Sequence, residues 1–264
     1  MAFLTPPYDD LIIPAYIGDV VLGQAPVKIL SSVCAKTKEE MIEQALAVEA
    51  SCADIIEWRA DWFEDDANWQ DAVRAMRKAV TKPVLYTFRT RAEGGVRTEP
   101  ISDASWRKKV REAIESGLFE AVDIEYERHR SEDLVNAARA SGVTSILSWH
   151  SFVPGYTEID FYDRLLDMSE TEADVLKLVA MPDHPAYVAD FCEQVASASR
   201  EINQPVIAMC MGKTGSITRI GSAVFGSSAT FASAAATSAP GQLDAETTRR
   251  LLDLFTEQAE PEKA

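Results

Sequence analysis

The chain has 264 residues, 47% of them hydrophobic and 26% charged, which is typical of a folded globular protein rather than of a disordered one. Its 42 acidic and 26 basic residues give a net charge of −16, which disfavours nucleic acid and anionic membrane surfaces as partners. No apolar run approaches the roughly 20 residues of a membrane span, and the first ten residues lack the basic start of a secretory signal, so we expect a cytoplasmic protein.

The first 26 residues contain two short apolar runs, residues 11–17 and 20–22, which are joined by Gly18 and Asp19. A short Gly-Asp connection between two such runs predicts a β-hairpin. We expect this hairpin to be an N-terminal extension that closes the bottom of the domain formed by the rest of the chain.

From residue 27 onward, eight short runs rich in apolar and β-branched residues alternate with longer segments of helical spacing. The runs are residues 27–35, 54–61, 83–90, 121–127, 144–152, 174–181, 205–212 and 230–235. This alternation predicts parallel strands with right-handed crossovers. Eight such units predict an α/β fold, the (β/α)8 or TIM barrel, as a single domain over residues 1–264. An open doubly wound sheet is the alternative, but no G-x-G-x-x-G follows any run.

The helical segments begin and end at residues with known capping preferences. Thr37 starts a capping-box pattern, and we expect Ser102 and Ser131 to cap the third and fourth helices. Gly117 and Gly142 stand where those two helices should end. These signals support the alternation of strands and helices.

Polar residues gather at the carboxyl ends of the predicted strands, where barrels of this kind carry their chemistry. They are Glu57, Arg59, Arg89, Glu93, His150, Lys177, Arg219, Ser238 and Gln242. We therefore expect these side chains to surround one site.

Lys177 lies in the middle of a run of aliphatic residues. Because parallel strands are buried on both faces, an ammonium group at this place must find a partner or lose its proton. One interpretation is a lysine paired with a buried carboxylate. The other, which we favour, is an amine that burial and nearby cations keep uncharged, so that it attacks a carbonyl and forms a Schiff base. Arg59, Arg89 and Arg219 would supply those cations.

The chain has three histidines, of which His150 alone ends a strand beside the strand of Lys177. His150 is therefore placed to move a proton next to the lysine. A histidine base usually needs an orienting partner on its other ring nitrogen, and we expect Glu93 in this role. His129 lies in a charged segment and His184 at a predicted helix start, which favours ordinary surface roles.

Two further patterns suggest other ligands but are weak. Asp123, Glu125 and Glu127 could hold a divalent metal, but without a histidine partner a hydrogen-bonding role is favoured. Residues 212–214 resemble the end of a phosphate loop, but Ile207 stands where that loop needs glycine.

Taken together, these motifs resemble type I 3-dehydroquinate dehydratase, a Schiff-base enzyme of the shikimate pathway. The resemblance covers essentially residues 27–242. The matching segments are residues 57–61, 87–89, 93–95, 148–152, 177–182, 211–219, 225–227 and 238–242. The chain departs from the family at Trp149 and Ser151, where Asn and Asp are frequent.

The resemblance implies a lyase that removes water from 3-dehydroquinate by syn elimination and gives 3-dehydroshikimate for aromatic amino acid biosynthesis. In this family Lys177 would form the imine, His150 would be the general acid and base, and Glu93 would orient it. The resemblance implies carboxylate binding by Arg219, Ser238 and Gln242, ring-hydroxyl binding by Glu57, Arg59 and Arg89, and a place near the same site for Ser32. It also implies a homodimer with no metal or organic cofactor.

Two other functions are the alternatives. A class I aldolase-type barrel uses the same imine to break carbon–carbon bonds, but the group of Arg219, Ser238 and Gln242 and the lack of a phosphate-binding glycine loop disfavour sugar phosphates. A barrel that serves only as a binding or regulatory module would lack the lysine or the histidine, and both are present.

Overall fold

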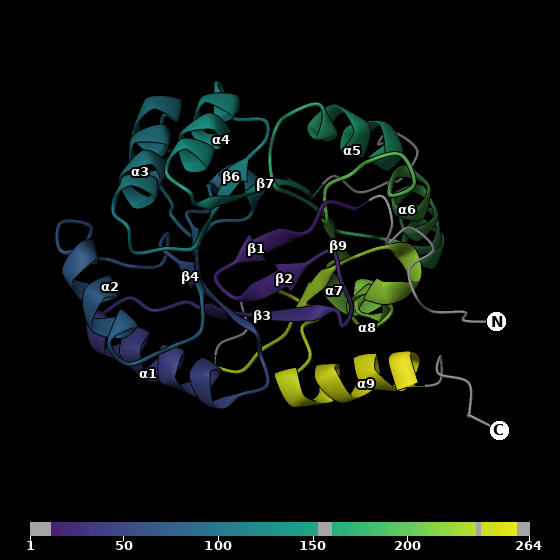
Figure 1. The fold of residues 1–264 in the computed structure, drawn as a ribbon, viewed down its shortest axis with the longest axis horizontal. Helices are drawn as coiled ribbons and strands as arrows, with labels where there is room; N and C mark the ends of the chain where they lie inside the picture. The colour runs from purple at the N-terminus through teal and green to yellow at the C-terminus, as the bar shows by residue number, and fades with distance from the viewer. Residues whose placement is uncertain (1–11, 153–159, 236–238, 258–264) are drawn as a thin grey trace.

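The computed structural model describes residues 12–152, 160–235 and 239–257. Within these ranges, eight strands form one parallel sheet in the order β10-β3-β4-β5-β6-β7-β8-β9, with helices around its outside (Figure 1). The strands are β3 (Lys28–Val33), β4 (Ile55–Arg59), β5 (Val84–Thr87), β6 (Ala121–Glu125), β7 (Thr144–Ser151), β8 (Val175–Ala180), β9 (Val206–Cys210) and β10 (Ala229–Phe231). The sheet confirms the predicted (β/α)8 architecture.

Helices follow the strands as the alternation predicts. They are α1 (Lys38–Ala50), α2 (Trp69–Arg77), α3 (Asp103–Glu115), α4 (Ser131–Ala140), α5 (Phe161–Ser169), α6 (Pro185–Ala198), α7 (Gly212–Gly215), α8 (Ile217–Ile220) and α9 (Ala245–Glu257), with 3-10 turns η1 (Arg91–Glu93) and η3 (Ser222–Phe225). Strands β3 to β9 lie in chain order around the ring, so functional groups far apart in the sequence become neighbours at its carboxyl end.

The ring closes where β9 meets β10, through a serine pair rather than a regular ladder. Ser228 N donates to the carbonyl oxygen of Val206 over 2.7 Å. The hydroxyl oxygen of Ser227 accepts from Ala208 N over 2.9 Å, in place of a backbone acceptor. These two bonds satisfy backbone donors that a sheet edge would leave unpaired.

The predicted hairpin is present. Strands β1 (Ala15–Ile17) and β2 (Val20–Leu22) pair antiparallel and cross the middle of the ring (Figure 1). Ile17 and Leu22 are fully buried and pack against the first inward side chains of the barrel strands. Those side chains are Leu30, Ile55, Leu85, Ala121, Ile146, Val175, Ile207 and Ala229. The hairpin therefore closes the barrel at the end opposite the polar site, while Leu11, the expected start of its first run, lies outside the described residues.

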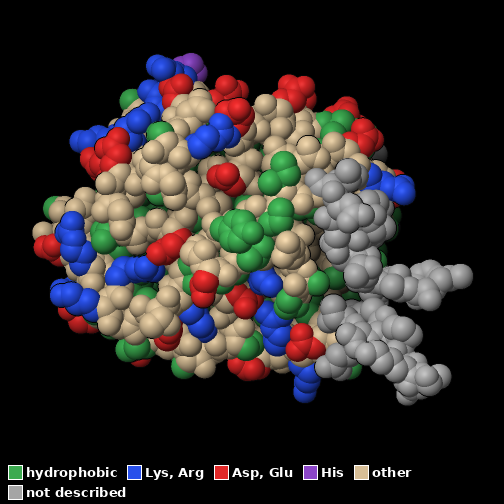
Figure 2. Space-filling view, in the orientation of Figure 1, with side chains coloured by type: hydrophobic (Ala, Val, Ile, Leu, Met, Phe, Trp, Pro, Cys, Tyr) green, Lys and Arg blue, Asp and Glu red, His purple; other side chains and the backbone are tan. Residues whose placement is uncertain are grey.

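The hairpin end of the molecule presents an apolar patch. Figure 2 shows this patch near the centre of the face, with acidic and basic side chains around it. Ile13 and Tyr16 are 67% and 59% exposed. No helix in the three described ranges is long and apolar enough to cross a membrane.

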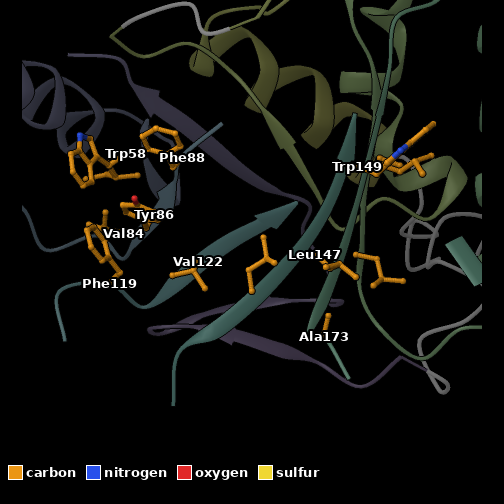
Figure 3. Packing of buried hydrophobic residues seen from close by; sticks show 14 of the residues in the cluster. Trp58, Val84, Tyr86, Phe88, Phe119, Val122, Leu147, Trp149 and Ala173 are labelled. Atoms are coloured by element: carbon orange, nitrogen blue, oxygen red, sulfur yellow. The ribbon is translucent and has the colours of Figure 1, made fainter. Parts of the chain in front are cut away.

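Between the barrel and its helices, aromatic side chains anchor the strands that carry the site. Figure 3 shows Trp58 of β4, Tyr86 of β5 and Phe119 together on this outer side. The ring of Phe119 stacks on Trp58 with centroids 5.8 Å apart and lies 5.2 Å from that of Tyr86. Because strand side chains alternate between faces, burial of Trp58 outside the barrel directs its neighbours Glu57 and Arg59 into the barrel.

Most of the predicted helix signals are confirmed. The hydroxyl of Thr37 accepts from the backbone at the start of α1, and that of Ser102 does so at the start of α3. Gly117 and Gly142 follow α3 and α4 with φ of +66° and +68°, which glycine adopts without strain.

Two local predictions were wrong. Ser131 does not cap α4: it is the first helical residue, and its hydroxyl donates to the carbonyl of Tyr126 over 3.0 Å, which leaves Arg130 at the cap position. The last strand is also shorter than the run 230–235, because Ser233 leaves the ring and donates its N–H to Leu243.

Candidate active site

A pocket of about 120 Å³ lies at the carboxyl ends of the strands. Eight of the ten predicted site residues line it: Glu57, Arg59, Arg89, Glu93, His150, Lys177, Arg219 and Gln242. Ser238 lies outside the described residues, so the structure does not place it. Val179, Met209, Met211 and Phe231 add an apolar wall.

Ser32, the remaining predicted residue, contacts a pocket residue instead of lining the pocket. Its hydroxyl donates to Glu57 Oε2 over 2.5 Å, and Thr87 Oγ1 donates to Glu57 Oε1 over 2.9 Å. Two hydroxyl donors from neighbouring strands thus fix the carboxylate of Glu57 at the pocket wall.

Lys177 of β8 points into the pocket and is only 4% exposed. Its Nζ lies 3.1 Å from Asp123 Oδ2, 3.8 Å from Glu57 Oε1 and 4.5 Å from the centroid of the Phe231 ring. The charged groups that contact Nζ are therefore carboxylates, and not the arginines expected from the sequence. Of the two interpretations, the structure shows the lysine paired with a buried carboxylate, at the wall of the pocket.

Arg89 is the centre of the buried charges. Its Nη2 donates to Asp123 Oδ2 over 2.7 Å, and its Nη1 lies within 3.2 Å of Glu93, Glu125 and the Ser148 hydroxyl. Burial opposes the charge on this guanidinium, but the carboxylates of Asp123 and Glu125 outweigh it and raise the pKa of Arg89. Arg89 therefore holds three carboxylates in place at the pocket wall.

Asp123 stays ionised in this setting. Burial alone would raise its pKa, but the charges on Arg89 and Lys177 outweigh burial and lower the pKa to about 2. Glu125 accepts from the N–H and the hydroxyl of Thr90, over 2.7 and 2.8 Å. These bonds confirm the hydrogen-bonding role favoured for this acidic strand. Within the described part of the chain, no three His, Cys, Asp or Glu side chains are arranged to hold a metal ion.

His150 and Glu93 make the expected contact. His150 Nδ1 lies 2.8 Å from Glu93 Oε2, which leaves Nε2 to exchange a proton with a bound molecule. Burial, together with the positive charges of Arg89 and Lys177, lowers the pKa of His150 well below its ordinary value. Burial and the charge on Glu125 raise the pKa of Glu93. The imidazole is therefore neutral at pH 7 and available as a base.

Arg59 lines the pocket but is also paired. Its Nε and Nη2 donate to the two carboxylate oxygens of Asp61, each over 2.8 Å. This bidentate geometry fixes the guanidinium plane at the end of β4.

Arg219 of α8 differs from the other two arginines. It is only 1% exposed, its Nη1 lies 3.2 Å from Met209 Sδ and 3.3 Å from the carbonyl oxygen of Phe231, and its buried Nε has no hydrogen-bond partner. No carboxylate within the described ranges pairs with it. Burial lowers the pKa of Arg219 to about 10. A buried guanidinium without a carboxylate is a ready site for an anion.

A close backbone contact positions the loop that carries Gln242. Gly212 N donates to the carbonyl of Pro240 over 3.0 Å. Gly241 has φ of +78°, and a Cβ there would lie 2.3 Å from the carbonyl oxygen of Gly212. Glycine is therefore required at this contact, which brings Pro240 and Gln242 to the pocket beside Arg219.

Residues 29–259 match the family described as Type I 3-dehydroquinase. The chain belongs to the type I 3-dehydroquinase family. The 3-dehydroquinate dehydratase of Salmonella typhimurium is 34% identical over 248 residues, which cover 90% of this chain and 97% of that protein. That of Enterococcus faecalis is 30% identical over 253 residues, with 92% and 98% covered. Membership confirms the resemblance seen in the sequence and the expected enzyme class, a hydro-lyase.

Solved structures of 3-dehydroquinate dehydratases share the fold, and the first of the two described here is of type I. The enzyme of Clostridium difficile with covalent modified comenic acid has a TM-score of 0.87 at 28% identity and covers 94% of this chain and 99% of its own. The enzyme of Geobacillus kaustophilus also has a TM-score of 0.87, at 26% identity, with 94% and 98% covered.

Sequence reasoning missed the roles of three carboxylates in this type I 3-dehydroquinase. Asp61 fixes Arg59, Glu125 fixes Arg89, and Asp123 contacts Lys177. The signal available for two of them was period-two alternation, since Asp123 and Glu125 occupy every second position of an otherwise apolar strand and so share its inward face.

Proposed function

We propose that this chain converts 3-dehydroquinate into 3-dehydroshikimate by syn elimination of water, through an imine between Lys177 and the substrate ketone. The observation that carries the proposal is one pocket that gathers a buried lysine, a neutral histidine and a buried arginine that no carboxylate of the described residues contacts. These groups supply a nucleophile, a base and an anion anchor.

The imine solves the main chemical difficulty of the reaction. A proton next to a ketone is a poor acid, because the carbanion left behind is unstable. Condensation of the Lys177 amine with the ketone releases one water and gives a protonated C=N bond. That bond accepts the electron pair of the departing proton, so the product of deprotonation is a neutral enamine.

His150 then moves the proton. Neutral Nε2 takes the proton from the carbon beside the imine, and the resulting imidazolium gives it to the departing hydroxyl, which leaves as water. Glu93 at Nδ1 orients the ring and stabilises its charged form. Hydrolysis of the imine consumes one water and restores Lys177, so the substrate loses one water in total.

Substrate orientation depends on the arginines and their neighbours. Arg219, with Gln242 and Ser238, holds the substrate carboxylate by charge-assisted hydrogen bonds. The ring hydroxyls face the wall that carries Glu57, Arg59 and Arg89. A fixed carboxylate determines which ring face His150 meets, which favours one stereochemical course.

The setting of the reaction is also part of the proposal. We propose a cytoplasmic enzyme of the shikimate pathway, one domain over residues 1–264, that acts without a cofactor as a homodimer. Sedimentation equilibrium is expected to give twice the chain mass of 29.0 kDa. A mass of one chain at micromolar concentration would contradict the dimer.

The reaction is tested by following the absorbance of the conjugated enone product with purified enzyme. Lys177→Met is expected to abolish turnover, and His150→Ala to lower kcat by about 10² to 10⁴ while the imine still forms. Lys213→Met, which removes a lysine that does not line the pocket, is the matched control and should keep activity. Near-normal turnover of Lys177→Met would overturn the proposed mechanism.

A further inference from the structure

A continuous chain of buried ionisable groups connects Lys177 to His150. Lys177 contacts Asp123, Asp123 contacts Arg89, Arg89 contacts Glu93, and Glu93 contacts His150, at 3.1, 2.7, 3.2 and 2.8 Å. Strands β6, β7 and β8 and the segment after β5 bring these groups together. The proposed mechanism uses the two end residues and Glu93, and leaves Asp123 without a task.

The carboxylate of Asp123 is tightly fixed. Its Oδ2 contacts both Arg89 Nη2 and Lys177 Nζ, and its Oδ1 accepts from the Ser148 hydroxyl over 2.6 Å. Asp123 is 2% exposed, so water does not screen its charge. Such a carboxylate acts on the lysine nitrogen through both direction and charge.

We propose that Asp123 is a positioning residue for the reaction: it directs the nitrogen of Lys177 into the pocket and stabilises positive charge on it, first as the ammonium and then as the protonated imine. This inference rests on the proposed function, because it assigns Asp123 a part in the imine chemistry.

The charge balance of the reaction agrees with this role. An ammonium group and a ketone give a protonated imine and one water, so the nitrogen beside Asp123 carries one positive charge before and after condensation. Deprotonation of the substrate then moves that charge to His150, which faces Glu93. The positive charge therefore lies beside Asp123 while it is on the lysine nitrogen and beside Glu93 while it is on His150. Arg89 contacts both carboxylates and holds them in place.

Other groups around Lys177 are less suited to this task. Glu57 is farther from Nζ, at 3.8 Å, and two hydroxyls already donate to its oxygens. Arg89 is itself a cation and disfavours positive charge nearby, and the Phe231 ring face adds only a weak attraction. Asp123 is thus the dominant stabilising charge for the lysine nitrogen.

The test compares Asp123→Asn with Glu125→Gln in the full-length enzyme. Both variants remove one carboxylate from Arg89 on the same strand, but only Asp123 contacts Lys177. For each variant, the rate of imine formation is measured from pH 5 to 10 in steps of about one unit. The enzyme is mixed with 3-dehydroquinate, the reaction is quenched with borohydride, and mass spectrometry gives the fraction of protein that carries the reduced adduct. The same samples give kcat from enone absorbance.

Asp123→Asn is expected to allow imine formation at lower pH but to slow turnover. Without the carboxylate, the ammonium form of the nucleophile loses the counter-charge that lies 3.1 Å away, so half-maximal imine formation shifts to lower pH by about one unit or more. The protonated imine is destabilised for the same reason, so kcat falls by about tenfold or more. Glu125→Gln should leave the imine profile within about 0.3 pH unit of the parent, because its charge does not contact the nitrogen.

A purely structural role for Asp123 would lower both rates without shifting the profile, and this result, or an equal shift in both variants, would overturn the inference. Should Asp123→Asn fail to fold, Ser148→Ala removes the 2.6 Å bond to Asp123, together with the 3.0 Å bond from Arg89 Nη1, and should give a smaller shift in the same direction. An unshifted profile in Ser148→Ala would then overturn it. Absence of an adduct in the parent enzyme is a separate result, since it contradicts the proposed function itself.

Discussion

At the scale of single residues, the pocket contains three cations that contact a carboxylate and one, Arg219, that contacts none among the residues the structure describes. Arg59, Arg89 and Lys177 each contact a carboxylate, whereas Arg219 contacts sulfur and backbone carbonyls. Burying a charge without a partner costs stability, and such a cost persists where function needs it. The unpaired guanidinium therefore favours an anionic substrate even though the whole chain carries a charge of −16.

Arg219→Met tests this distinction. The variant removes a buried charge and keeps an apolar chain of similar length, so the free energy of unfolding should stay unchanged or rise by about 1 kcal/mol. KM for 3-dehydroquinate should rise by about a hundredfold, because the carboxylate anchor is lost. Urea unfolding and steady-state kinetics measure the two effects, with Arg74→Met on the exposed surface of α2 as control. A strong loss of stability with unchanged KM would contradict the anchor.

The pH dependence of activity follows from His150. The neutral imidazole is the base, and burial with the nearby cations lowers its pKa, so the base form persists at pH values where an ordinary histidine is protonated. The acid limb of kcat/KM is therefore expected below about pH 6.5. A pH–rate profile of the free enzyme measures it, and a limb at or above that pH would show that the imidazole is not shielded in this way.

At the scale of elements, the two ends of the barrel have separate tasks. The hairpin β1–β2 fills the amino end with Ile17 and Leu22, and the loops after the strands build the pocket at the carboxyl end. Stability and chemistry should therefore respond to different substitutions, as is usual for this fold.

Leu22→Ala is expected to show this separation. Truncation of a fully buried leucine leaves a cavity and should lower the free energy of unfolding by about 2 to 5 kcal/mol. KM should not change, because the hairpin does not touch the pocket. Val20→Ala, a partly buried neighbour, is the control and should cost less. A tenfold change in KM for folded Leu22→Ala would contradict independent ends.

Local pattern was sufficient for most elements but not for contacts between them. The eight runs, the hairpin and the helix signals at Thr37 and Gly142 are local, so the sequence predicted them. The pair of Asp123 and Lys177 joins β6 to β8 across the barrel interior, and no spacing along the chain encodes which facing carboxylate a lysine meets. The three expected arginines do line the same pocket as Lys177, but Asp61 pairs with Arg59 and Asp123 with Arg89, and the charged groups that contact the lysine nitrogen are carboxylates.

At the scale of the whole molecule, a net charge of −16 stands against a pocket lined by four cationic side chains and two carboxylates. Like charges on the surface repel one another and weaken the folded state. Salt screens these exposed charges but hardly affects the buried network, where water is excluded. Added salt should therefore change the free energy of unfolding but leave the buried charge network of the pocket unchanged.

Raising NaCl from about 20 to about 200 mM at pH 8 is therefore expected to raise the midpoint of urea unfolding, by about 1 kcal/mol or less in free energy. Repeating the series near pH 4.6, the isoelectric point of the sequence, provides the control, and the salt effect should vanish there. A lower midpoint in salt at pH 8 would mean that attractive surface ion pairs outweigh the repulsion.

The central claim is that Lys177 bonds covalently to the substrate ketone. Incubation with 3-dehydroquinate and borohydride, followed by peptide mapping, is expected to find a single adduct on the peptide that carries Lys177 and none in Lys177→Met. An adduct on a different lysine, or full turnover with no adduct at all, would contradict the account.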